Sequence, residues 1–310
     1  MSSVGSVVIA GSSGYLGRYV SAAFDNGGWS VTRLDREPVP EASTSPASLA
    51  PDSVQNDLTL VQSIADLLVS RKPDCWVHLA GAASVARSFE FPALDFEMSL
   101  LPLLNVLEAI RLSGSKCRVL LASSAAIYGE PSLLPVPESC AGKPISPYGF
   151  HKLQQELLIE EYNRFHGIAA CNARIFSTYG PGLKQLAVWD IAKRALGGDF
   201  SIWGSGMETR DYLFASDVAR AILCLCENAP FRGEAINVGS GHEISIVELA
   251  KCIYGEIEAN RMPQLKPSPV SGNPVRWRAD VSLLNSMGFS PTVTLDAGIK
   301  ETVEWIGKHV

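Results

Sequence analysis

The sequence predicts an α/β protein with a doubly wound parallel sheet and a second, smaller α/β lobe. Three observations lead to this prediction. Short apolar runs alternate with helical segments, a glycine-rich turn follows the first apolar run, and the alternation loses its rhythm after about residue 177. Strands separated by helices form parallel sheets that are covered on both faces. We therefore expect a first domain at 1–177 and a lobe at 178–310, with some lobe segments returning to the first domain.

The individual elements follow from short patterns. Apolar runs predict buried strands at 4–10, 29–35, 75–80, 118–122 and 170–176. Helical spacing predicts helices up to Asn26 and at 58–70, 91–112 and 147–166, then near 186–196, 215–228, 245–253 and 295–307. Ser146 and Pro147 are typical of a helix start, and Gly114 and Gly167 of helix ends. Residues 36–53, rich in Pro, Ser and Ala, predict a loop with a weak helix.

Composition limits the classes of partner. The chain has 310 residues, 46% of them hydrophobic, and a net charge of −6, which argues against a general nucleic-acid binder. Its seven cysteines are scattered, without the paired Cys-x-x-Cys units of a zinc site, so we expect no metal. Free thiols favour a cytoplasmic location. The sequence also predicts no signal peptide and no membrane span.

The glycine-rich turn predicts a dinucleotide site. Gly11, Gly14 and Gly17 follow a strand and open a helix, where the backbone can approach a pyrophosphate at the helix N-terminus. Their spacing is G-x-x-G-x-x-G, not the general G-x-G-x-x-G. Asp35 ends the second strand, where a carboxylate accepts hydrogen bonds from the adenosine ribose and repels a 2′-phosphate, which favours NAD. Arg36 could hold such a phosphate, so NADP stays possible.

A catalytic trio is predicted from three residues that are distant in the sequence. Tyr148 and Lys152 lie four residues apart, on one face of a helix. The lysine ammonium and a cationic nicotinamide would lower the pKa of the phenol from its ordinary value near 10, so that Tyr148 could act as an acid or base. Ser124 follows the strand at 118–122, at the edge where a doubly wound sheet binds its ligands. Its hydroxyl could bond the oxygen that exchanges a proton with Tyr148.

With these motifs in place, the chain resembles the extended short-chain dehydrogenase/reductases, specifically the NAD-dependent nucleotide-sugar epimerase/dehydratase family. The matching segments occur in family order over nearly the whole chain: GSSGYLG (11–17), NDL (56–58), HLAGAASV (78–85), SSAAIYG (123–129), SPYGFHK (146–152), RIFSTYGPG (174–182), GSGMETRDYLFASDVARA (204–221), NVGSG (237–241) and RWRAD (276–280). The resemblance implies a Rossmann domain for the cofactor and a second lobe that binds a nucleotide-diphosphate sugar.

The resemblance also implies roles for single residues. Asp57 and Leu58 would hold the adenine, and the arginines Arg210 and Arg276 would grip the substrate diphosphate. The implied cofactor residues are Gly11, Gly14, Tyr15, Leu16, Gly17, Asp35, Arg36, Asp57, Leu58, Leu79, Ala80, Gly81, Tyr148 and Lys152. The implied substrate residues are Ser84, Ser124, Ser177, Arg210 and Arg276. A homodimer that pairs the helices near 91–112 and 147–166 is a further implication.

Some positions depart from the family pattern. The 4,6-dehydratases carry acidic residues directly after the catalytic hydroxyl, where this chain has Ala125 and Ala126. Ser99 and Ser177 stand where relatives often have asparagine. The segment 183–190 is unlike the usual epimerase sequence. Dehydration and decarboxylation are therefore disfavoured, and the sugar site is expected to differ from that of a UDP-galactose epimerase.

Three functions remain open from the sequence. The first is a nucleotide-sugar 4-epimerase, in which Tyr148 takes the C4 hydroxyl proton and a transient 4-keto sugar forms. The second is an NAD(P)H-dependent 4-ketoreductase of a 4-keto-6-deoxy nucleotide sugar, favoured by Arg36 and the serine departures. The third is a non-catalytic dinucleotide-sensing protein, which would more often have lost Tyr148 or Lys152.

Overall fold

A seven-stranded sheet forms the centre of the protein, and every neighbouring pair of its strands is parallel. The computed structural model describes residues 4–36, 53–258, 261–266 and 274–310. The strand order is β10-β6-β5-β4-β1-β2-β3. The strands are β1 (Ser6–Ala10), β2 (Ser30–Asp35), β3 (Ser53–Gln55), β4 (Cys75–His78), β5 (Arg118–Ser124), β6 (Ala170–Ile175) and β10 (Arg232–Val238). The predicted fold class is confirmed.

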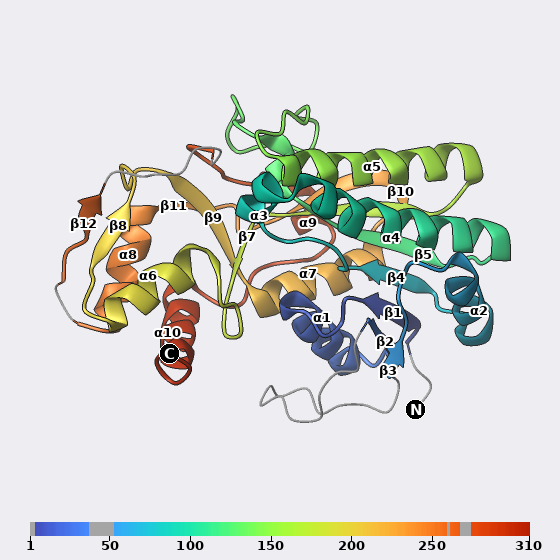
Figure 1. The fold of residues 1–310 in the computed structure, drawn as a ribbon, viewed down its shortest axis with the longest axis horizontal. Coiled ribbons are helices and arrows are strands. Elements are labelled where there is room, and N and C mark those ends of the chain that lie inside the picture. Colours follow the sequence, from blue (N-terminus) through green and yellow to red (C-terminus); the bar gives the residue numbers. More distant parts are fainter. Residues whose placement is uncertain (1–3, 37–52, 259–260, 267–273) are drawn as a thin grey trace.

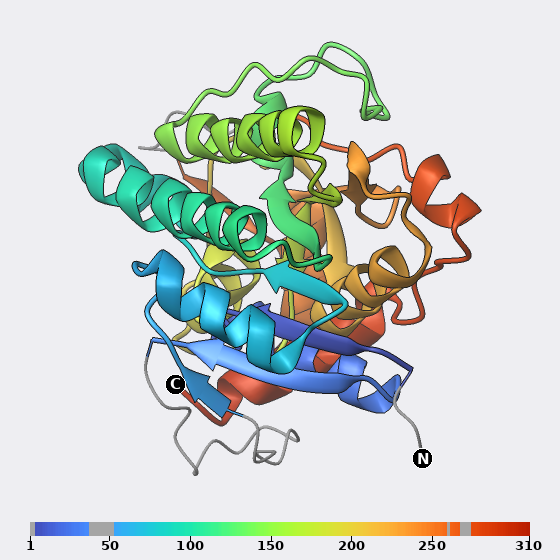
Figure 2. The ribbon, with the colours of Figure 1, turned by 90° about the vertical axis from the view of Figure 1, so that its right-hand side faces the viewer.

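Helices cover both faces of this sheet (Figures 1 and 2). One face carries α2 (Val61–Arg71), α4 (Pro92–Ser113) and α5 (Pro147–His166), which pack side by side. The other face carries α1 (Tyr15–Asn26) and α7 (Ala215–Asn228), which pack against each other. The order of the strands reverses between β1 and β4, so the crevice at their carboxyl ends is the place where such sheets bind ligands.

The helix-end signals in the sequence are confirmed. The Oγ of Ser146 accepts a hydrogen bond from the backbone N–H of Gly149 at 3.1 Å, and Pro147 fills the first turn of α5. Gly114 and Gly167 end α4 and α5 in the left-handed conformation, with φ of 65° and 68°. A short helix that was not predicted, α3 (Val85–Glu90), precedes α4 and is separated from it by Phe91.

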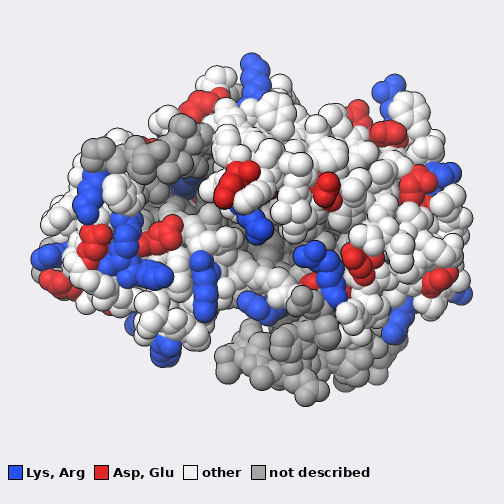
Figure 3. Space-filling view, in the orientation of Figure 1, with Lys and Arg blue, Asp and Glu red and all other residues white. Residues whose placement is uncertain are grey.

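The second lobe is smaller and contains two short sheets (Figure 1). The predicted helices near 186–196, 245–253 and 295–307 are confirmed, but none of the strands here was predicted. The elements are β7 (Ser177–Tyr179), β9 (Thr209–Phe214) and β11 (Glu243–Ser245) in one sheet, β8 (Ser201–Trp203) and β12 (Gln264–Lys266) in the other, and α6 (Leu186–Leu196), α8 (Ile246–Gly255) and α10 (Leu295–Gly307). Figure 3 shows a hollow between this lobe and the main sheet, with Lys and Arg side chains near its edges.

Segments beyond residue 177 also belong to the main sheet. β10 pairs with β6, α7 packs on α1, and the short helix α9 (Ser282–Ser286) packs on β10. The fold therefore has no single domain boundary at residue 177. The division of the chain there stays a proposal about which part binds the cofactor and which part binds the sugar. Of the loop expected at 36–53, residues 37–52 lie outside the described residues, and Ser53 begins β3.

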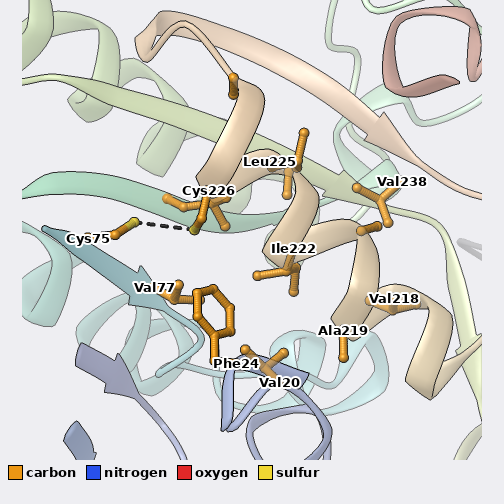
Figure 4. Packing of buried hydrophobic residues seen from close by; sticks show 14 of the residues in the cluster. Val20, Phe24, Cys75, Val77, Val218, Ala219, Ile222, Leu225, Cys226 and Val238 are labelled. Carbon is orange, nitrogen blue, oxygen red and sulfur yellow. Dashed lines mark hydrogen bonds between the residues drawn. The ribbon is translucent and has the colours of Figure 1, made fainter. Parts of the chain in front are cut away.

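The core lies on both sides of the sheet because successive strand residues point to opposite faces. In β4, Cys75 and Val77 pack against α1 and α7, whereas Trp76 packs toward α2 and α4. Figure 4 shows the first of these clusters, in which the sulfur atoms of Cys75 and Cys226 lie 3.3 Å apart in the same apolar packing. Full burial of one apolar side chain contributes roughly 1.5–3 kcal/mol to the free energy of folding. This packing holds both helix layers against the sheet and thereby fixes the positions of the strand ends.

Candidate active site

The three predicted catalytic side chains converge at the carboxyl end of β5. Ser124 ends this strand and caps the short 3-10 helix η1 (Ala125–Tyr128), with its Oγ accepting from the N–H of Ala126 at 3.1 Å. The hydroxyl of Ser124 is near enough to that of Tyr148 to lower the pKa of the phenol. The ammonium of Lys152 lies 5.9 Å from the centre of the Tyr148 ring and donates to the carbonyl oxygen of Ala122 at 2.9 Å.

The electrostatics of the trio differ from the expectation. Burial raises the pKa of Tyr148, and the nearby hydroxyl of Ser124 opposes this only in part. Burial also lowers the pKa of Lys152 to about 8. The protein alone thus raises the pKa that was expected to fall, because desolvation of the phenolate dominates and Lys152 is not among the groups that shift it. The phenol is held protonated and can donate a proton.

A buried polar network connects the elements that carry the trio. It was not predicted from the sequence. The Oγ of Ser123 donates to Glu156 at 2.5 Å, and the guanidinium of Arg174 pairs with the same carboxylate at 2.7 Å. Arg174 also donates to the hydroxyl of Tyr128 at 2.9 Å. These contacts join β5, α5, β6 and η1, so the strand end that carries Ser124 is fixed against the helix that carries Tyr148 and Lys152.

The glycine turn fits the pyrophosphate of a dinucleotide. A Cβ at Gly17 would overlap the carbonyl oxygen of Gly11 and lie 2.7 Å from the Cα of Ser12. Gly11 has φ of 86°, and a Cβ there would lie 2.8 Å from the backbone nitrogen of Ala80. The first turn of α1 has no side-chain cap, so its N–H groups are available to an anion. Such a close backbone approach is possible only with glycine.

Asp35 lies beside this turn, at the end of β2. Its Oδ2 accepts from the backbone N–H of Ser13 at 3.0 Å and from the Ser13 hydroxyl, and its Oδ1 accepts from the N–H of Arg36 at 2.8 Å. The carbonyl of Asp35 accepts from the N–H of Asn56 at 3.0 Å, which places Asp57 and Leu58 next to it. Asp57 is exposed and Leu58 is buried. The predicted adenosine residues thus lie along one edge of the glycine turn.

A cavity of about 240 Å³ includes Gly81, one of the implied cofactor residues, in its lining. Gly81, Ser84 and Arg87 line one side, Asp95 of α4 lies on another, and Gln185 comes from the loop before α6. Ser84 caps α3, with its Oγ accepting from the N–H of Arg87 at 3.3 Å. A larger cavity of about 580 Å³ lies around Lys72, Asp74 and Arg118, at the amino ends of β4 and β5, and contains none of the predicted site residues.

The two predicted diphosphate arginines have different surroundings. Arg210 in β9 is half-buried, donates to the carbonyl of Thr209 at 2.7 Å and lies over the ring of Trp277 at 5.3 Å. Burial lowers its pKa, and within the described residues it has no carboxylate partner. Arg276 is 55% exposed and paired with Glu243. Arg210 is thus the arginine with charge left to offer, and Ser177 lies on the neighbouring strand β7.

Other residues of the site also escaped the sequence reasoning. Arg18 donates to the carbonyl of Ser13 at 3.3 Å, which places a cation at the glycine turn. His151 pairs with Asp95 at 2.5 Å, one residue from Lys152. Arg18 follows Gly17 directly, so its place in the sequence was a usable signal. The Asp95–His151 pair joins two helices that are distant in the sequence. No local sequence pattern could have predicted this contact.

Residues 7–239 match the model of the NAD dependent epimerase/dehydratase family. The chain is 33% identical over 260 residues to the UDP-glucose 4-epimerase of Mycolicibacterium smegmatis, covering 82% of this chain and 80% of that protein. Two solved structures are also similar. The Thermotoga maritima UDP-glucose 4-epimerase with UDP-glucose is 28% identical with a TM-score of 0.86, covering 98% of this chain and 99% of that one. The Thermus thermophilus UDP-glucose 4-epimerase with NAD is 27% identical with a TM-score of 0.84, covering 98% and 100%.

Proposed function

Because the chain belongs to the NAD-dependent epimerase/dehydratase family, we propose that it is a nucleotide-sugar 4-epimerase that acts through a transient 4-keto sugar. It is an NAD-dependent enzyme with the extended short-chain dehydrogenase/reductase fold, so the reading as a non-catalytic sensor falls away. The observation that carries the proposal is the convergence of Ser124, Tyr148 and Lys152 at the ligand crevice. The relatives named UDP-glucose 4-epimerases support the position of the reaction on the sugar.

The proposed mechanism assigns the proton movements to the trio. Tyr148 removes the proton of the C4 hydroxyl when the sugar is oxidised and returns it when the ketone is reduced. Ser124 holds the same oxygen through its hydroxyl, and Lys152 provides positive charge beside the phenol. Bound NAD supplies the oxidising and reducing power at the sugar carbon. Because burial raises the pKa of Tyr148, the positive charge of the bound cofactor is needed before the phenol acts as a base.

The residues after Ser124 argue against dehydration. Ala125 and Ala126 are buried and carry no group that exchanges protons. Loss of water from the sugar would need a second acid and base at such positions. The trio alone provides one proton-transfer group, which is what inversion at C4 requires.

Arg210 is proposed to bind the diphosphate of the substrate. Arg210→Ala is expected to weaken binding of UDP by roughly 30-fold, since a charge-assisted hydrogen bond contributes about 2 kcal/mol. Calorimetry on the NAD-loaded protein measures this affinity. Arg232→Ala is the matched control, because Arg232 is exposed at the start of β10. Equal UDP affinity in both variants would remove Arg210 from the site.

A homodimer and a cytoplasmic location are also proposed. The outer faces of α4 and α5 expose apolar side chains, including Leu101, Leu112, Phe150, Leu157 and Phe165. These exposed apolar side chains support pairing of the two helices with a second copy. Sedimentation velocity measures this oligomeric state.

All seven cysteines are free, which supports the proposed location in a reducing compartment. In the described part of the chain, no helix has the length and apolar character to cross a bilayer.

The function is tested with UDP-glucose as the first substrate. The purified protein should interconvert the 4-epimers to equilibrium without added cofactor, as followed by chromatography and mass spectrometry. The alternative is a 4-ketoreductase, which would consume NADPH in proportion to product from a 4-keto-6-deoxy nucleotide sugar. Conversion that stops without added NADPH would favour the reductase.

A further inference from the structure

Asp95 is a buried carboxylate that lines a cavity and whose charge acts on Tyr148 and Lys152. It lies on the first turn of α4, is 5% exposed in its side chain and contributes to the lining of the 240 Å³ cavity. The same cavity is lined by Ser84, which is one of the implied substrate residues, and by Gly81. A buried carboxylate needs hydrogen-bond partners for each oxygen. The partners of Asp95 therefore indicate what is left for a ligand.

One oxygen of Asp95 is occupied and the other is free. Oδ2 accepts from Nδ1 of His151 at 2.5 Å. Oδ1 has no hydrogen-bond partner among the described residues, yet it is not sealed off in the interior. Since Asp95 lines the cavity and Oδ1 is not sealed off, Oδ1 is the carboxylate oxygen that can accept a hydrogen bond from a ligand in that space.

His151 fixes the orientation of this carboxylate. It lies on α5 between Tyr148 and Lys152, and its ring packs edge-on against Phe96 with centroids 5.6 Å apart. The pair thus ties the first turn of α4 to the turn of α5 that carries Tyr148 and Lys152. Asp95 is close enough to act on both catalytic side chains, because its charge raises the pKa of Tyr148 and that of Lys152.

We infer that Asp95 binds a hydroxyl group of the hexose through Oδ1 and that His151 is the positioning residue that holds Asp95 for this contact. The inference rests on the proposed function, since it names a contact to the sugar of that same substrate. The contact selects a sugar with a hydroxyl donor at the cavity. It adds nothing to the binding of the nucleotide, which lies with Arg210 in the other lobe.

The first experiment compares a nucleotide sugar with its nucleotide. Asp95→Asn keeps the shape of the side chain but removes its charge, and is expected to weaken UDP-glucose binding to the NAD-loaded protein by roughly 10-fold or more. UDP binding should be unchanged. Glu97→Gln is the control, because it removes the same charge from an exposed position on α4. Equal ratios of UDP-glucose to UDP affinity in both variants would overturn the inference.

The second experiment varies the positioning residue, so that the outcome does not depend on one variant folding. His151→Gln keeps an N–H donor for Asp95 and is expected to stay within about threefold of the parent in UDP-glucose affinity. His151→Phe removes the donor and should lose affinity as Asp95→Asn does. If both His151 variants bind UDP-glucose like the parent, the positioning role is wrong.

The pH profile provides a readout that a purely structural role would not change. The charged or titratable groups that share the cavity with Asp95 or feel its charge are Arg87 of α3 and Tyr148 and Lys152 of α5. Asp95 raises the pKa of Tyr148, so Asp95→Asn should move the acid limb of kcat to lower pH. An acid limb that stays in place in Asp95→Asn contradicts the placement of this charge beside the phenol.

The two hypotheses fail in different ways. A parent that binds UDP-glucose but does not invert it refutes the epimerase function, while the Asp95 contact is still decided by the binding ratio. A parent that inverts UDP-glucose, with Asp95→Asn equal to Glu97→Gln in both affinity ratio and KM, refutes the Asp95 contact alone. A parent that binds neither UDP nor UDP-glucose refutes both.

Discussion

Tyr148→Phe should reduce the epimerisation rate by about 10³-fold or more, because it removes the group that exchanges the sugar proton. The substitution deletes one oxygen and keeps the ring beside Lys152 and the helix start at Ser146. Binding of NAD and of UDP should stay within a few-fold of the parent. The change is measured as kcat with UDP-glucose, together with the amount of NAD that copurifies.

Tyr162→Phe is the matched control for this variant. Tyr162 lies on the same helix and donates its hydroxyl to Glu108 at 2.6 Å, on the side facing α4. Removal of the Tyr162 hydroxyl should leave kcat within about threefold of the parent. It should lower the free energy of unfolding by about 1 kcal/mol, since one hydrogen bond is lost. If Tyr148→Phe keeps more than a tenth of the parent kcat, the phenol is not the proton-transfer group.

Gly17→Ala should release the cofactor. The added Cβ would overlap the carbonyl of Gly11 and press on the Cα of Ser12 at 2.7 Å, and neither backbone atom can move without opening the turn. We expect a protein that purifies without NAD and is destabilised by about 1–3 kcal/mol, as other overpacked sites are. Cofactor content after acid release and the midpoint of urea unfolding measure the two effects.

Gly255→Ala is the control for an added methyl group on a helix. A Cβ at Gly255, the last residue of α8, meets no atom within 4 Å. This variant should retain the cofactor and unfold at or above the parent midpoint, since alanine is the better helix former. Normal NAD content in Gly17→Ala would mean that the glycine turn tolerates a wider geometry than the close packing on Gly11 implies.

Strands β1, β2, β4, β5 and β6 of the main sheet were predictable because they are largely buried on both faces, whereas the mostly exposed β3 and the partly buried β10 were not predicted. Segments such as Val7–Ile9 read as continuous apolar runs, and glycine and serine mark the helix ends that follow. Four strands of the second lobe, β7, β8, β11 and β12, have only three residues each, and β12 is fully exposed. Strands of this length form because of tertiary contacts with neighbouring elements and carry no clear periodic pattern of their own. They therefore could not be predicted from the sequence.

The candidate site was predictable where chemistry depends on local spacing. The glycine turn and the Tyr148–Lys152 pair each lie within one turn or one helix, and their placement follows from the chain itself. The Asp95–His151 pair and the Glu156–Arg174 network join different elements, so only the fold brings them together. The rise in the pKa of Tyr148 in the protein alone could not be predicted for the same reason, because burial is set by the packing of α5 rather than by its sequence.

The most direct test of the account follows the hydrogen atom on C4 during epimerisation. UDP-glucose that carries deuterium at C4 is incubated with the protein in ordinary water, without added cofactor, and the epimer is examined by NMR. The account predicts an inverted C4 that keeps its deuterium, because the ketone forms and is reduced within one closed site while Tyr148 exchanges only the hydroxyl proton. Epimer with hydrogen from solvent at C4, or no inversion at all, would contradict it.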